Sequence, residues 1–401
     1  MKSISLPLLS EVRAAAEKPN GWPLLRLGFR PFYLGAALSA ALLVPLWLLV
    51  LLGGVQVQTS VPALVWHAHE MLFGFVLAVI VGFLMTAVKN WTGLATPRGP
   101  WLAGLALLWL SARLAAFGAS PMLYAVLDWA LLPLVTGVLV RLLLRSRNFR
   151  NLPLTGLLAL LSLANLGFHL SVNDKLDLSP LVFMHAALAL ILMIEIVIGG
   201  RVIPAFTMAV HPGVKLLRKP VLEWMTVGFT GLGLLYWVAA RPSWIGALLL
   251  GAAGMLHLRR WLGWQPQLSL GRPILWILHA AYAWMALGLM LLAMAQIGAV
   301  ADSIGLHALA VGATGGLITG MMTRTARGHT GRPLVPSTGE VAAYWLVMGS
   351  ALLRIGIPLV APAFTTAALV LAGAAWGLAF LLFVWRFFPW LMQTRLDGKD
   401  G

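Results

Sequence analysis

The sequence predicts an all-α, polytopic membrane bundle, and its composition, its apolar runs and the placement of its charges support that class. Of the 401 residues, 60% are hydrophobic and only 10% carry a formal charge, whereas soluble domains have roughly 25% charged residues. A bilayer span needs about 20 apolar residues. Such runs occupy about 33–53, 64–88, 100–117, 120–144, 152–171, 179–199, 220–240, 243–258, 273–297, 303–323, 340–360 and 362–385. We therefore expect about twelve transmembrane helices.

Basic residues alternate between the two sides of these expected helices. The net charge is +16, but 24 of the 28 Lys and Arg residues fall on one side, and the exceptions are Arg113, Lys175, Arg241 and Arg354. Because Lys and Arg collect in cytoplasmic loops, we expect cytoplasmic N- and C-termini, a lipid-bilayer partner and no nucleic acid. We divide the chain into a cytoplasmic leader (1–32) without a signal peptide, a transmembrane domain (33–388) and a cytoplasmic tail (389–401).

The chain contains no cysteine. Disulfides, cysteinyl iron–sulfur clusters, thiolate copper sites and covalent c-type haem are therefore excluded. Any metal must be bound by histidine, methionine or carboxylate side chains, or belong to a non-covalent cofactor.

The second, sixth and tenth expected helices share a pattern. Each has a histidine near its outer end and a basic residue near its inner end: His69 with Lys89, His185 with Arg201, and His307 with Arg324. The pattern favours three four-helix units, by analogy with the catalytic subunit of haem–copper oxidases, although basic inner ends occur in any polytopic protein.

Four histidines are expected in the outer third of the bundle, and His169 ends its helix at the same level; the four are His67, His69, His185 and His307. Imidazole is the commonest metal ligand, and polar groups inside a bilayer tend to persist where function needs them. The layer therefore predicts bound haem or copper. On a regular helix His67 and His69 point about 200° apart, so we expect the second helix to stand between two centres, unless His67 precedes the regular helix.

Two carboxylates within expected spans, Glu70 and Glu195, are candidates for proton transfer or for orienting a histidine ligand. Glu70 is expected to share a helix face with His67. We interpret Asp128 and Arg113, on neighbouring helices, as a structural ion pair.

Two further histidines lie in expected helices. His169, beside a polar loop, is interpreted as an interfacial residue satisfied by a backbone carbonyl. His279 shares a helix face with Tyr282, three residues along. It either ligates a second centre or bonds a neighbouring helix.

Compact basic turns are expected on the inner side at 199–207 and 322–332. Glycine allows close backbone approach, and the arginine fork pairs with carboxylates. Arg201 and Arg324 are thus candidates to hold haem propionates or another anion, the alternative being that they only set topology. Arg327 and Arg332 are interpreted as topology signals.

Six segments carry a family resemblance: 28–32, 66–74, 90–93, 200–207, 279–282 and 327–332. On these motifs the chain resembles the NnrS family throughout its length. The resemblance implies a bacterial inner-membrane protein with non-covalent haem b and copper, associated with denitrification and the response to nitric oxide. It also favours, as metal ligands, His67, His69, His185, His279 and His307.

From these features we expect a haem- and copper-binding protein that binds nitric oxide and reduces or detoxifies it, with Glu70 or Glu195 carrying protons. The electron donor is left open between quinol and a separate redox protein. Two alternatives remain, a non-catalytic nitric-oxide sensor or scavenger and a permease for metal or a small anion.

Overall fold

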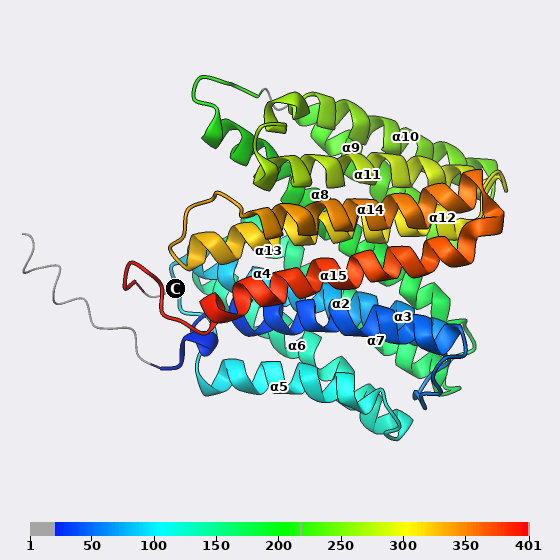
Figure 1. Ribbon diagram of the computed structural model, residues 1–401, viewed down its shortest axis with the longest axis horizontal. Coiled ribbons are helices and arrows are strands. Elements are labelled where there is room, and N and C mark those ends of the chain that lie inside the picture. Colours follow the sequence, from blue (N-terminus) through cyan, green and yellow to red (C-terminus); the bar gives the residue numbers. More distant parts are fainter. Residues whose placement is uncertain (1–20, 217–218, 400–401) are drawn as a thin grey trace, which may run out of the picture.

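The computed structural model describes residues 21–216 and 219–399, and every regular element within these ranges is helical. The long helices lie roughly along one direction (Figure 1). In chain order they are α2 (Phe29–Leu51), the composite α3 (Ala63–His69), η2 (Glu70–Val76) and α4 (Leu77–Thr92), α5 (Pro100–Ala115), α6 (Pro121–Arg145), α7 (Leu152–Val172), α8 (Pro180–Val210), α9 (Pro220–Ala239), α10 (Trp244–Leu262), α11 (Pro273–Gln296), the composite α12 (Asp302–His307), η5 (Ala308–Gly315) and α13 (Gly316–His329), α14 (Thr338–Val360) and α15 (Thr365–Leu391).

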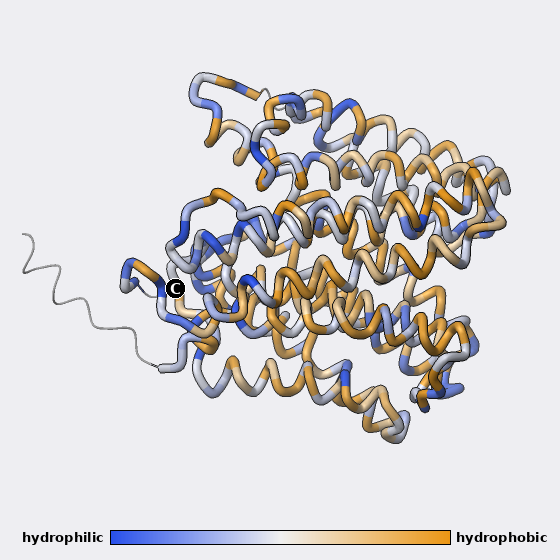
Figure 2. Tube along the Cα trace, viewed as in Figure 1, coloured by the Kyte–Doolittle hydropathy of each residue, from blue (hydrophilic) through white to orange (hydrophobic). Residues whose placement is uncertain are grey.

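The expected class, an all-helical membrane bundle, is confirmed. In the described part of the chain, ten helices are long and apolar enough to cross a bilayer. The 16-residue α5 is shorter, and α10 is not among the ten. Figure 2 shows the apolar stretches running along the helices and hydrophilic residues gathering at their ends. A count of twelve spans, the grouping in fours and the N-in, C-in orientation stay predictions.

Serine and proline fix where several helices begin. Proline occupies the first turn of many of them, where its missing N–H costs nothing. Ser120, Ser179 and Ser243 each accept a backbone N–H at the start of α6, α8 and α10, which satisfies a donor that the helix leaves free. At α14, Ser337 and Glu340 form a reciprocal capping box. These caps therefore fix the residue at which each of these helices begins.

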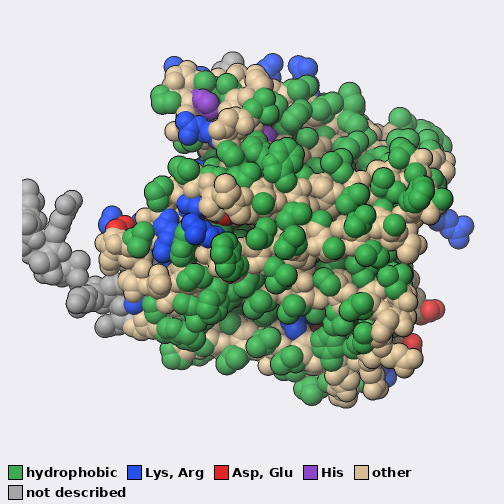
Figure 3. Space-filling model, viewed as in Figure 1, with side chains coloured by type: hydrophobic (Ala, Val, Ile, Leu, Met, Phe, Trp, Pro, Cys, Tyr) green, Lys and Arg blue, Asp and Glu red, His purple; other side chains and the backbone are tan. Residues whose placement is uncertain are grey.

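Helices from the two ends of the chain close the bundle. The N-terminal α2 packs against α15 as well as α4, and Figure 1 shows the blue and red helices side by side. Small residues allow this approach, as at Gly377 of α15, where an added Cβ would lie 3.2 Å from the Ala41 carbonyl oxygen of α2. Large apolar side chains cover the outer surface of the helices, and basic ones gather at the end that holds the C-terminus (Figure 3). This distribution suits a lipid environment.

Two π-helical segments interrupt the second and tenth apolar runs. The segment η2 directly follows His69, and η5 directly follows His307. A π-turn re-aims the side chains around it and is frequent at functional sites. Two of the three histidines in the sequence pattern, His69 and His307, are thus each followed by the same backbone irregularity, whereas His185 lies in the continuous helix α8.

The expected basic turns at 199–207 and 322–332 are wrong in part. Helix α8 continues to Val210 and α13 continues to His329. Proline at position 204 removes one backbone hydrogen bond, but Ile203 and Thr207 beside it are fully buried, and this packing favours continuation. Only residues 330–332 of the second segment lie beyond its helix.

Candidate functional site: a histidine-lined cavity and a buried polar cluster

A cavity of about 320 Å³ lies between α2, α3, η2, α8, α12, η5, α14 and α15. His67, His185 and His307 line it, one from each of the second, sixth and tenth apolar runs, although the predicted repeat named His69 in the second. It lies at the end of the bundle opposite the C-terminus, where α3 and α12 begin (Figure 1). The structure therefore brings together three of the five predicted histidine ligands.

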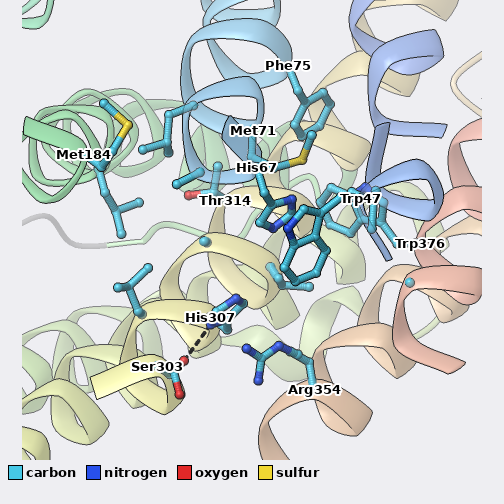
Figure 4. Close-up of a pocket in the computed structure, with 18 of the residues that line it drawn as sticks. Trp47, His67, Met71, Phe75, Met184, Ser303, His307, Thr314, Arg354 and Trp376 are labelled. Atoms are coloured by element: carbon cyan, nitrogen blue, oxygen red, sulfur yellow. Dashed lines mark hydrogen bonds between the residues drawn. The ribbon is translucent and has the colours of Figure 1, made fainter. Parts of the chain in front are cut away.

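Local contacts fix the orientation of these rings. His307 Nδ1 lies 2.7 Å from the Ser303 carbonyl oxygen, and a carbonyl can only accept, so Nδ1 carries the proton and Nε2 keeps its lone pair. His67 stacks on Trp47, with ring centroids 4.0 Å apart. Its buried Nδ1 has no hydrogen-bond partner among the described residues. Figure 4 shows both imidazoles at the same cavity, with Arg354 beside them.

The remaining lining is apolar apart from a few polar groups. Trp47, Phe75 and Trp376 supply aromatic surface, while Thr314 and Arg354 supply a hydroxyl and a guanidinium. The sequence interpretation missed Arg354 as a site residue. A cation in an apolar helix is itself a signal of function, and it could have been found on that ground.

The neighbouring histidine, His69, lies outside this cavity in a buried polar cluster of α3, η2, α5, α6 and α7. Its Nε2 lies 3.1 Å from Asn165 Oδ1 and 3.1 Å from Asp128 Oδ2. Its Nδ1 lies 2.9 Å from the Tyr124 hydroxyl. His67 and His69 thus lie in different environments on the two sides of one helix, as the helical angle predicts.

The expectation that Glu70 shares a face with His67 is wrong. Glu70 belongs to the His69 cluster, where its Oε1 accepts from Arg113 Nη1 at 2.8 Å. A π-helical segment starts at Glu70, so the regular helical period does not hold beyond this residue. The guanidinium of Arg113 on α5 then supplies the charge partner that a buried carboxylate needs.

The ion pair expected between Arg113 and Asp128 is present, but it belongs to a larger cluster. His169 was interpreted as an interfacial residue, and this is wrong: it is buried, and its Nε2 lies 2.9 Å from Asp128 Oδ2. His69, Asp128 and His169 offer ligand atoms within 4.8 Å of one another. Sequence spacing could not show that α6 and α7 meet here.

Glu195 on α8 lies next to the histidine-lined cavity, behind Thr314. Its Oε2 accepts from Thr314 Oγ1 at 3.0 Å, and Thr314 also lines that cavity. Glu195 itself borders a narrow cavity of about 70 Å³, together with Tyr33. The carboxylate therefore stands between two cavities.

His279 and Tyr282 do not join the three cavity histidines. His279 Nε2 lies 3.0 Å from Thr207 Oγ1 on α8, which fits the alternative of a bond to a neighbouring helix. The Tyr282 hydroxyl lies 2.7 Å from His257 Nδ1 and accepts from Arg260 at 2.8 Å. The sequence interpretation gave His257 no role. Ligation by His279 stays a prediction.

Arg201 and Arg324 line a separate cavity of about 670 Å³ at the basic end. Arg201 donates to Asn151 at 2.7 Å, and Arg324 lies 3.6 Å from the ring centroid of Phe206. This inner cavity shares no lining residue with the histidine-lined one. Arg354, by contrast, is the guanidinium near His67 and His307.

Fold and site together define a multi-pass helical membrane protein with imidazoles gathered in an apolar cavity. Its particular family follows from comparison with known proteins. The chain belongs to the NnrS family, because the model of the NnrS protein family matches residues 23–395. No curated protein matches the chain. Membership of this family suggests a membrane protein of the nitric-oxide response.

Proposed function

We propose that this protein is a haem- and copper-containing protein of the bacterial inner membrane that binds nitric oxide and reduces it. Its task would be to relieve nitrosative stress during denitrification. The observation that carries the proposal is that His67, His185 and His307 line the same apolar cavity.

The cavity lining carries the kinds of group that a haem would need. Iron and copper with nitrogen ligands need imidazole lone pairs directed at the metal, and the Ser303 carbonyl leaves such a lone pair on His307 Nε2. The buried Nδ1 of His67 lacks a partner among the described residues. Arg354 supplies a cation for a propionate, which the more distant Arg201 and Arg324 do not supply at this cavity.

The cavity walls suit a small neutral gas. Aromatic and aliphatic side chains dominate the lining, so water is disfavoured and an uncharged diatomic molecule is tolerated. A bound haem would supply a site for the gas and a store for an electron. The protein's own residues position that group and keep the site apolar.

One buried carboxylate, Glu195, lies beside the cavity and could pass protons to it. Reducing two nitric oxide molecules to one nitrous oxide and one water consumes two electrons and two protons. Thr314 lines the histidine-lined cavity, and its partner Glu195 borders the second, smaller cavity. We therefore assign proton delivery to Glu195. Glu70 is paired with Arg113 away from the cavity. Electrons would come from quinol or a separate redox protein.

Anaerobic turnover of purified protein tests the proposal. With a chemical reductant and excess nitric oxide, we expect nitrous oxide from the unsubstituted protein and at least a tenfold loss in His67→Ala. His211→Ala is the matched control, because His211 bonds the Leu268 carbonyl away from the cavity. Stoichiometric binding without nitrous oxide would identify a sensor or scavenger. Absence of both a Soret band and copper would overturn the haem–copper proposal and leave the permease as the alternative.

A further inference from the structure

The buried cluster around His69 has the geometry of a second metal site. His69 Nε2 and His169 Nε2 lie 3.1 and 2.9 Å from the same atom, Asp128 Oδ2. Asn165 Nδ2 also donates to that oxygen at 2.7 Å. Three nitrogen atoms from two helices thus converge on one carboxylate oxygen. Such convergence is more than a carboxylate needs as a simple hydrogen-bond acceptor.

The spacing matches what a metal ion requires. Ligands at 2.0–2.1 Å in a tetrahedral arrangement lie about 3.3 Å from one another. The distances from Asp128 Oδ2 to the two imidazole nitrogens are shorter than this by only a few tenths of an ångström. Asn165 Oδ1, 3.1 Å from His69 Nε2, is placed to be a fourth ligand atom. A small expansion of the cluster would therefore make room for an ion.

The charges of the cluster call for one more cation. Glu70 and Asp128 carry two negative charges, and Arg113, which bonds both of them, supplies one positive charge. All three side chains are at least 94% buried. Because a buried uncompensated charge is costly, the remaining negative charge attracts a further positive one, either a proton on a histidine or a metal ion.

The surroundings hold the ligand rings in position. His69 stacks on Phe168, with centroids 4.4 Å apart, and its Nδ1 lies 2.9 Å from the Tyr124 hydroxyl. That hydroxyl lies 3.4 Å from Glu70 Oε1. Metal-binding histidines commonly have their second ring nitrogen bonded to such a partner, which fixes the tautomer. The Tyr124 and Glu70 side chains would serve this purpose.

We propose that His69, Asp128 and His169 bind a transition-metal ion that accepts imidazole and carboxylate ligands, such as copper or zinc. Helix α3 and its π-helical extension then separate this ion from the histidine-lined cavity. The inference rests on the proposed function in one respect: it assigns the copper of that proposal to this cluster. A haem measurement and a metal measurement on the same sample keep the two claims distinguishable.

Metal titration of the full-length protein tests the inference. We would strip the purified protein with a chelator, add Cu²⁺ as the probe, count bound copper by elemental analysis, and record its electron paramagnetic resonance spectrum. The unsubstituted chain should bind about one tight Cu²⁺ at this site with nitrogen hyperfine structure from two imidazoles. Losing a group that only hydrogen-bonds a metal ligand weakens metal binding by up to about 100-fold. His169 is proposed as a ligand itself, so His169→Gln should weaken copper binding by at least that factor.

A matched control and a second variant keep the result decisive. His257→Gln removes an equally buried, hydrogen-bonded histidine on α10 and should leave the copper signal unchanged. Asp128→Asn should also lose it, and if this variant does not fold, His169→Gln decides alone. No tight Cu²⁺ in the unsubstituted chain, or the same spectrum and stoichiometry in His169→Gln, would overturn the inference. Loss of haem with copper retained in His169→Gln would overturn the inference and would also count against the cavity as the haem site.

Discussion

Single residues decide which of two environments a histidine enters. His67 and His69 are separated by one residue, yet one lines an apolar cavity and the other contacts Asp128 and Asn165. The helical angle predicted this divergence from the sequence. It could not predict the position of Glu70, because the π-helical segment that begins there interrupts the regular period.

The role assigned to Glu195 gives a prediction at the same scale. Glu195→Gln keeps the size and the Thr314 contact but cannot carry a proton, so we expect nitric-oxide reduction to fall by roughly 100-fold, at the lower end of what positioned proton-transfer groups contribute. Haem content should not change. Turnover and absorption spectra measured on one preparation would check this, and unchanged turnover would remove Glu195 from the proton route.

At the scale of elements, caps and buried ion pairs stabilise the helix ends near the C-terminus. Arg327 on α13 donates to Glu340 on α14, with Nε 2.7 Å from Oε1, and Glu340 also caps α14 through Ser337. The sequence interpretation took Arg327 for a topology signal. Its partner Glu340 lies thirteen residues away across a loop, and nothing in the local pattern showed that the two side chains would meet.

Breaking this contact should destabilise the bundle. Glu340→Ala leaves Arg327 buried without its carboxylate and removes the cap, and loss of one partner of a buried pair costs about 3–5 kcal/mol. We therefore expect a clear fall in the thermal midpoint in detergent. Asp397→Ala removes an exposed partner of Arg395 and should not change the midpoint measurably. Equal midpoints for the two variants would contradict this account.

How far the sequence predicts this molecule differs between its elements. Runs of apolar residues predicted the helices well, because the bilayer demands a fixed length of apolar chain. The continuation of α8 past Pro204 was missed, since it depends on burial of Ile203 and Thr207 by other helices. For the same reason, spacing indicated that His67, His185 and His307 share a depth, but not that Asp128 and His169 meet His69.

At the scale of the whole molecule, the charge distribution predicts its orientation. The chain has no cysteine, so single cysteines at exposed positions can report the side on which each loop lies. We expect Asp177→Cys, between α7 and α8, to react with a membrane-impermeant maleimide in spheroplasts of the producing cells. Val335→Cys, between α13 and α14, should react only after the membrane is opened. The reverse labelling pattern would show that the orientation is opposite to the predicted one.

The central claim is that one helix, α3 with its extension η2 and α4, separates a haem in the cavity from a second metal in the buried cluster. Haem and metal contents of purified His67→Ala and His69→Ala, measured beside the unsubstituted protein, test it most directly. The account predicts that His67→Ala loses or shifts the Soret band and keeps the second metal, while His69→Ala keeps the Soret band and loses that metal. Loss of the same signal in both variants would contradict it.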